Sequence, residues 1–213
     1  HFLEMYKLPY EYIGIERLDD GGYRFGDYPG YTPSYVSRLK DMIDIHTAGK
    51  LNDIGENVHA LSKSWFDRGT GVDQLQKNLV NYFHNIHKDL PPSLKMSGTF
   101  KNYESKIKGK GYSRSFVTFN ARATNQYRNR LCLAYAANVF MNVNEKTFYQ
   151  KHGINVDEDM YALSIMVQWI WRSAIRDGDK IYLYIPSKRM RDLLINWIDN
   201  MSNTTKGEVI SEE

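Results

Sequence analysis

The chain has 213 residues, of which 42% are hydrophobic, and a formal net charge of +3 at pH 7. This length is enough for one well-packed core, or for a core with a small second lobe. A single cysteine, Cys132, excludes a disulfide framework and fits a reducing, cytoplasmic location. The six histidines show no metal-ligand spacing, and no apolar run approaches the length of a membrane span. We therefore expect an intracellular protein without a metal site, a signal peptide or a membrane segment.

The positive charge is concentrated in one part of the chain. Residues 101–130 contain eight basic residues against one acidic residue, Glu104, and so carry a formal charge of +7. The rest of the chain is net acidic. A basic segment on an otherwise acidic chain favours a polyanion as the partner.

The first 54 residues are predicted to form a small, tyrosine-rich lobe. Residues 10–17 and 22–25 flank an Asp-Asp-Gly-Gly turn and predict a β-hairpin. Thr32 and Pro33 predict the start of a helix that ends near Gly49. We expect most of the tyrosines to pack this lobe; the alternative is that they stack on nucleic-acid bases.

The rest of the chain alternates strands with helices, which predicts an α/β fold. The expected strands are residues 57–62, 94–99, 115–121 and 180–185. The expected helices are residues 72–90, 100–107, 146–152, 160–176 and 188–201. Residues 124–142 fit either a helix or a buried strand. The predicted domains are therefore the N-terminal lobe at 1–54, an α/β domain at 55–202 and a tail at 203–213. The chain begins with His1 rather than Met, so we expect it to be a piece of a longer polypeptide or a chain with a trimmed end.

One predicted helix has an unusual polar stripe. Gln168, Arg172 and Arg176 are each four residues apart and would share one helix face. Trp169, Ile165 and Ile175 lie beside this stripe, and large apolar groups are unusual next to a face that meets only water. The pattern favours contact with an anion or with a partner. The alternative is a solvated helix face.

A second group of polar residues follows the predicted strand at 115–121. It consists of Asn120, Arg122, Thr124 and Asn125. Open α/β sheets bind ligands at the carboxyl ends of their strands, and these side chains suit phosphate. The alternative is an ordinary Asx-rich turn that leads into the next element.

A third group lies in the glycine-containing loop that begins near residue 106. Lys108, Lys110 and Arg114 can follow a phosphate backbone, and Tyr112 among them can stack on a base. A solvated basic loop explains the same residues equally well.

Several catalytic sites are disfavoured. Ser62 and His59 lie in no nucleophile elbow and have no acid placed by a motif, so we expect His59 to be a core residue. The chain has no Gly-x-x-x-x-Gly-Lys-Ser/Thr phosphate loop and no strand that ends in a tandem acidic pair for Mg²⁺. We therefore expect no complete nucleotide-hydrolysing site in this chain alone.

The order of these motifs resembles a known family. The similar segments are a strand that begins near His59, a polar strand-end motif at 119–127, and residues 168–178 followed by Tyr-Ile-Pro-Ser at 184–187. Together they resemble the second RecA-like domain of superfamily 2 helicases of the DEAD/DEAH-box type, especially phage and plasmid helicases. The resemblance covers residues 55–200 and implies a RecA-like, mostly parallel sheet flanked by helices.

The resemblance also implies roles for the motif residues. Arg172 and Arg176 would be arginine fingers, with Gln168 as a polar contact, and would complete a site for ATP and Mg²⁺ that an N-terminal RecA-like domain of the same polypeptide holds. Arg122, Thr124 and Asn125 would contact the backbone of DNA or RNA. The chain departs from the family's motif at two points. Trp171 stands where the family usually has Gly, and Arg172 and Arg176 are four residues apart, where the family usually has a spacing of three.

We therefore expect the nucleic-acid-binding C-terminal half of an ATP-dependent helicase or translocase. One alternative is a replication or packaging accessory that binds nucleic acid without nucleotide chemistry. Another is a viral or structural assembly protein whose tyrosine-rich lobe forms subunit contacts.

Overall fold

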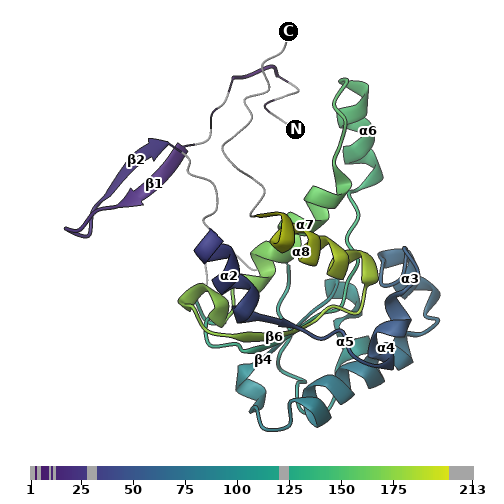
Figure 1. The fold of residues 1–213 in the computed structure, drawn as a ribbon. Coiled ribbons are helices and arrows are strands. Elements are labelled where there is room, and N and C mark those ends of the chain that lie inside the picture. The colour runs from purple at the N-terminus through teal and green to yellow at the C-terminus, as the bar shows by residue number, and fades with distance from the viewer. Residues whose placement is uncertain are drawn as a thin grey trace. The chain divides into compact units, whose positions relative to one another are not determined.

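A computed structural model describes residues 3, 6–9, 11, 13–27, 33–119 and 125–201. The chain divides into two compact units. One combines His1–Leu39, Asn142–Val156 and Asn196–Glu213, and the other combines Lys40–Met141 with Asp157–Ile195. The second unit contains a four-stranded sheet with helices on both faces (Figure 1).

The sheet is entirely parallel and has the strand order β3-β6-β5-β4. Its strands are β3 (Ile43–Ile45), β4 (Lys95–Gly98), β5 (Cys132–Tyr135) and β6 (Ile181–Tyr184). Cys132 is in register with both Lys95 and Tyr182, so the amino ends of the strands lie at one edge and the carboxyl ends at the other. The predicted fold class, a mostly parallel sheet flanked by helices, is confirmed.

Different helices cover the two faces of the sheet. Cys132 and Ala134 belong to a core with Phe66 of α3 (Lys63–Arg68), residues of α4 (Val72–Val80), the π-helix η2 (Asn81–Ile86) and Ile107 of α5 (Glu104–Ile107). Tyr135 instead contacts Trp169 of α7 (Glu158–Ile170), with ring centroids 5.4 Å apart. Helix α8 (Lys188–Asn200) lies on the same side as α7 (Figure 1). Burial on both faces explains the continuous apolar sequence of β5.

Short helical turns connect these elements. They are η1 (Lys50–Gly55), η3 (Pro92–Leu94), η4 (Lys101–Tyr103) and η5 (Ala174–Asp177). The other unit contains the antiparallel hairpin of β1 (Ile13–Arg17) and β2 (Tyr23–Asp27), which confirms the predicted hairpin, and α6 (Val143–Lys151).

The predicted helix at 33–49 is too long. Helix α2 (Pro33–Met42) ends where β3 begins, because Ile43 and Ile45 pair with Ile181 and Leu183 of β6. β-Branched residues favour this pairing over a further helical turn. The sheet therefore begins before residue 55, the predicted start of the α/β domain.

The predicted strand at 57–62 is wrong. These residues form turns, and the Asn57 side chain accepts a hydrogen bond from the His59 backbone N–H at 2.9 Å. Leu61 has φ +62°, a left-handed conformation that no strand accommodates. His59 is exposed, so its predicted place in the core is also wrong.

Two expectations for residues 115–142 are resolved. Residues 132–135 form a strand, which excludes the helical alternative there. Of the strand predicted at 115–121, the described part makes a single parallel bridge between Phe116 and Ser97.

The predicted helix at 160–176 ends early, and this changes the arginine stripe. Helix α7 stops at Ile170, because the backbone N–H of Ala174 donates to the carbonyl of Arg130 at 3.0 Å instead of to Ile170. The Ser173 hydroxyl donates a hydrogen bond to the Ile170 carbonyl at 2.6 Å. Arg172 therefore lies in a turn and Arg176 in η5, so they do not share one helix face.

Candidate anion-binding edge

Four arginines gather at the amino-terminal edge of the sheet. They lie in the turn before β5 and in the segment before β6: Arg128, Arg130, Arg172 and Arg176. Backbone hydrogen bonds hold these segments together, from Ala174 to the Arg130 carbonyl at 3.0 Å and from Tyr182 to the Leu131 carbonyl at 2.8 Å. The parallel register therefore places four positive charges along one edge.

Arg176 joins two of the motifs that the sequence analysis found separately. Its side chain is exposed, and Nη1 donates to Asn125 Oδ1 at 2.9 Å. One guanidinium N–H is thus used to orient the group, and an exposed guanidinium retains donors for an anion.

Arg172 and Arg130 are only partly exposed, and each has an enclosed Nε–H. Within the described residues, neither Nε atom has a hydrogen-bond partner. Arg130 donates from Nη1 to the Ser93 carbonyl, and burial lowers the pKa of its guanidinium. An unpaired buried donor on a charged group costs free energy. An anion that accepted a hydrogen bond from either N–H, after a change of side-chain rotamer, would recover this cost.

Arg128 and Asp177 form a two-point ion pair at the same edge. Nε of Arg128 donates to Oδ2 at 2.8 Å, and Nη2 donates to Oδ1 at 2.7 Å. The hydrogen bond from Arg128 is the main cause that lowers the pKa of Asp177, and the charge of Arg176 also lowers it. The pKa of Arg128 is raised by the same contact.

The apolar residues beside the predicted stripe do not line an accessible cleft. Gln168 is exposed on α7, but Trp169 and Ile175 are buried. Trp169 Nε1 donates to the Val117 carbonyl at 3.0 Å, which fixes α7 to the sheet. Both side chains are buried inside this domain, so Trp169 and Ile175 do not border an exposed polar stripe as the sequence pattern suggested.

The predicted nucleic-acid contacts are only partly described. Asn120, Arg122 and Thr124 lie outside the described residues. Lys108 pairs with Glu104 at 3.0 Å, and Lys101 pairs with the same carboxylate at 2.6 Å. Glu104 therefore offsets part of the charge of the basic segment.

In the loop that follows, Lys110 and Arg114 are exposed. Tyr112, which was predicted to stack on a base, is instead buried. Its ring stacks on Phe83 with centroids 4.6 Å apart, and its hydroxyl donates to the Ile107 carbonyl at 2.5 Å. The loop therefore offers charge without an exposed aromatic ring at this position.

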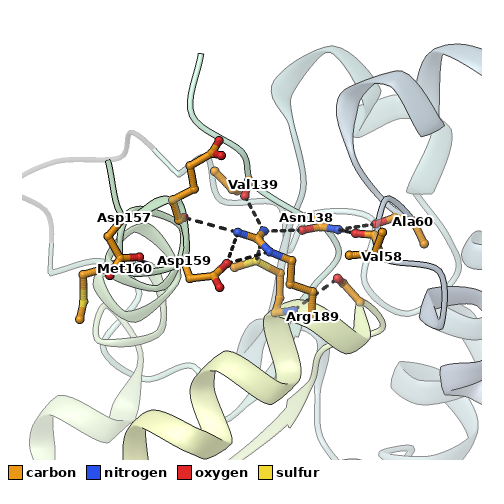
Figure 2. Close-up of polar contacts among 11 residues, drawn as sticks. Val58, Ala60, Asn138, Val139, Asp157, Asp159, Met160 and Arg189 are labelled. Atoms are coloured by element: carbon orange, nitrogen blue, oxygen red, sulfur yellow. Dashed lines mark hydrogen bonds and ion pairs between the residues drawn. The ribbon is translucent and has the colours of Figure 1, made fainter. Parts of the chain in front are cut away.

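The carboxyl-terminal edge holds a second arginine group that the sequence analysis missed. Figure 2 shows the Arg189 guanidinium between Asp159 and Asn138. Nη1 donates to Asn138 Oδ1 and to the Val139 carbonyl, both at 2.9 Å, and Nη2 donates to Asp159 Oδ1 at 2.6 Å. Asn138 in turn donates to the carbonyls of Val58 at 2.8 Å and Ala60 at 3.0 Å.

Arg191, on the same turn of α8, is likewise bound by oxygen atoms of the protein. Nη1 donates to Asn52 Oδ1 at 3.1 Å and to the Ile185 carbonyl at 2.9 Å. One feature of the sequence could have indicated this arginine group: Arg189 and Arg191 both lie in the first turn of a predicted helix. The helix macrodipole disfavours cations there, so two arginines at this position indicate compensating contacts. The guanidinium groups of Arg189 and Arg191 are thus bound by the protein's own oxygen atoms, whereas Thr99 Oγ1 and His46 Nε2, just beyond the carboxyl ends of β4 and β3, are buried without a hydrogen-bond partner among the described residues.

Comparison with known proteins identifies the domain. The family model described as the YonV C-terminal Rossmann-like domain matches residues 37–198. The chain belongs to this family. The chain is also 44% identical over 163 residues to the SPbeta prophage-derived uncharacterized protein YonV of Bacillus subtilis (strain 168). The match covers 76% of this chain and 39% of that protein, so the chain spans well under half the length of its relative. No solved structure matches it significantly.

The YonV C-terminal domain match includes both arginine groups and the complete sheet, and it leaves out the β1–β2 hairpin. Within the described residues, no cluster of three or more His, Cys, Asp or Glu side chains is placed to hold a metal ion. No helix in the same part of the chain is long and apolar enough to cross a membrane. Among the described residues of this Rossmann-like domain, the amino-terminal edge is the candidate site for an anion, because the arginine side chains of two adjoining segments gather there.

Proposed function

We propose that this domain is the arginine-supplying, nucleic-acid-binding C-terminal half of an ATP-dependent helicase or translocase. It works with an N-terminal RecA-like domain of the same polypeptide, acts on DNA or RNA in the cytoplasm, and needs no membrane. The single observation that carries the proposal is the arginine edge, where an exposed guanidinium on Arg176 is oriented by Asn125 beside the underbonded side chain of Arg172.

In this proposal Arg176 is the arginine finger. Its exposed guanidinium, fixed by one hydrogen bond, suits a phosphoryl group presented by a facing domain. Arg172 supplies a second positive charge, and Gln168, exposed on the last turn of α7, supplies a polar contact. ATP with Mg²⁺ provides the phosphoryl-transfer chemistry, and the facing domain provides the metal ligands.

The nucleic-acid contacts belong to the basic segment before β5. Lys108, Lys110 and Arg114 are exposed, and Lys108 pairs with Glu104. Asn125 accepts a hydrogen bond from Arg176 of the arginine edge, and the proposed contacts Asn120, Arg122 and Thr124 precede Asn125 in the sequence. Contacts of this kind bind the phosphate backbone and depend strongly on salt.

The test is nucleic-acid-stimulated ATP hydrolysis by the complete polypeptide. We expect Arg176→Ala to lower kcat about 1,000-fold, because arginine fingers contribute factors of roughly 10³ to 10⁵. Affinity for a single-stranded oligonucleotide is expected to change less than about threefold, since one phosphate contact at most is lost. We also expect the 213-residue chain alone to show negligible turnover.

Arg68→Ala is the matched control, because Arg68 is an exposed arginine in the last turn of α3 and belongs to neither arginine group. A variant at Arg176 that loses oligonucleotide affinity while turnover is unchanged would refute the finger role. That result would instead favour an accessory protein that binds nucleic acid without nucleotide chemistry.

A further inference from the structure

The carboxylate of Asp177 lies in a position that a phosphate group would suit. Arg128 holds it through two parallel N–H···O contacts of 2.8 and 2.7 Å. Arg176 is close enough for its charge to act on the same carboxylate. Two-point contact with a planar guanidinium is the geometry by which arginine recognises both carboxylates and phosphates.

This ion pair is accessible to ligands and exchangeable. The side chains of Arg128 and Asp177 are 59% and 33% exposed. Exposed pairs contribute little net stability, because water and salt compete with both partners. An incoming phosphate with more negative charge than one carboxylate can therefore replace Asp177 on Arg128 at small cost.

The charge balance of the edge favours such an exchange. Arg128, Arg130, Arg172 and Arg176 face this edge, and among the described residues Asp177 is the carboxylate bound to them. Displacing Asp177 leaves Arg128 and Arg176 free to share a single anion.

We infer that Arg128 is part of the anion site and that Asp177 is an internal competitor, a carboxylate that occupies the site until a phosphate-bearing ligand displaces it. The inference rests on the proposed function only for the nature of the ligand, a phosphate group. The phosphate can come from a nucleotide or from a nucleic-acid backbone.

The test is equilibrium binding by the 213-residue chain and uses two probes. A fluorescent 20-mer of oligothymidylate reports backbone phosphate, and ATP without metal reports nucleotide phosphate. Asp177→Asn removes the competing charge and is expected to tighten binding of one probe about three- to tenfold. For the oligonucleotide, the plot of log affinity against log salt should steepen by about 0.7, the value for one additional contact with single-stranded phosphate.

Asp179→Asn is the matched control. It makes the same change in net charge two residues away, at a side chain that is also exposed. The double variant Arg128→Gln with Asp177→Asn should lose the gain, because the freed guanidinium is then absent. Thermal melts of all variants confirm that each is folded.

A gain with the oligonucleotide assigns the site to nucleic acid, and a gain with ATP assigns it to the nucleotide. The inference is overturned if neither probe binds more tightly, if Asp179→Asn gives the same gain, or if the gain persists without Arg128. None of these outcomes depends on ATP turnover, so failure here is distinct from failure of the finger role of Arg176.

Discussion

At the scale of single residues, two glycines fix how closely segments of this domain approach. A Cβ on Gly98 would lie 2.8 Å from the Trp169 ring, and one on Gly55 would lie 1.7 Å from the Pro186 carbonyl oxygen. The first neighbour is a side chain, whereas the second is backbone and cannot turn away. Gly55 thus allows η1 to pack directly against the carboxyl end of β6.

Gly55→Ala should therefore be severely destabilising. We expect a loss of about 3 kcal/mol or more, at or above the upper end of the usual cost of overpacking, because the backbone of Pro186 must move. For a chain of this length, that loss corresponds to a fall in Tm of about 6–12 °C. Gly26→Ala is the control, since its nearest neighbour is the flexible Glu16 side chain at 3.5 Å. Equal melting temperatures for the two variants would contradict the expected clash.

At the scale of elements, Arg189 connects three segments at the carboxyl edge. It binds Val139, just before the chain leaves for α6, and Asp159, just after the chain returns (Figure 2). Its guanidinium also lies over the Phe140 ring, 4.4 Å from the centroid. Arg189 is thus the residue that holds the first turn of α8 to the start of α7 and to the end of the β5 segment.

Arg189→Gln should destabilise the domain by about 2–3 kcal/mol, since hydrogen bonds to charged groups contribute roughly 1.5–3 kcal/mol and Asn138 Oδ1 loses a donor. Urea denaturation measures this change. Lys188→Gln is the control: Lys188 pairs with Asp192 on the helix surface, and such pairs contribute only a few tenths of a kcal/mol. If both variants unfold at the same urea concentration, Arg189 does not connect these segments as described.

At the scale of the whole molecule, two histidines border the core that contains Tyr82, on one face of the sheet. His46 and His87 both contact the ring of Tyr82, with centroids 5.7 and 4.7 Å away. Burial is the main cause that lowers the pKa of each histidine. The charges of His46 and Lys95 lower the pKa of His87 further, and Asp44 opposes the shift at both rings.

These shifts predict that acid destabilises the protein. In the folded state both histidines keep a pKa below 6.5, whereas the unfolded chain takes up protons near 6.5. As pH falls below about 6.5 the unfolded state binds more protons than the folded state, so the free energy of unfolding falls with pH; because both rings are only half-buried, the slope for each stays well below the limit of about 1.4 kcal/mol per pH unit. Denaturation at pH 8, 7, 6 and 5 measures this slope. His87→Gln should reduce the slope, and the exposed His59→Gln serves as the control; an unchanged slope in His87→Gln would contradict the prediction.

Much of the fold was predictable from local pattern. The hairpin, the start of a helix at Val72 and the strand at 94–99 follow from turn residues and from the period of apolar side chains, whereas the helix predicted to reach residue 90 ends at Ile86 after a π-helical segment. The parallel sheet followed from the alternation of strands and helices. The errors occur where a tertiary hydrogen bond overrides a local preference, as at Ala174, whose N–H leaves the helix for the Arg130 carbonyl.

The sequence by itself determined the α/β class, the basic segment and the residues with donors for phosphate, because composition and periodicity are local properties. Only the tertiary structure decided that Arg176 meets Asn125, that Arg128 holds Asp177, and that Arg189 is enclosed by carbonyls. The reason is physical. Whether an arginine faces solvent, a carboxylate or a backbone carbonyl depends on strand register and on where helices end, and both are set by contacts between residues far apart in the chain.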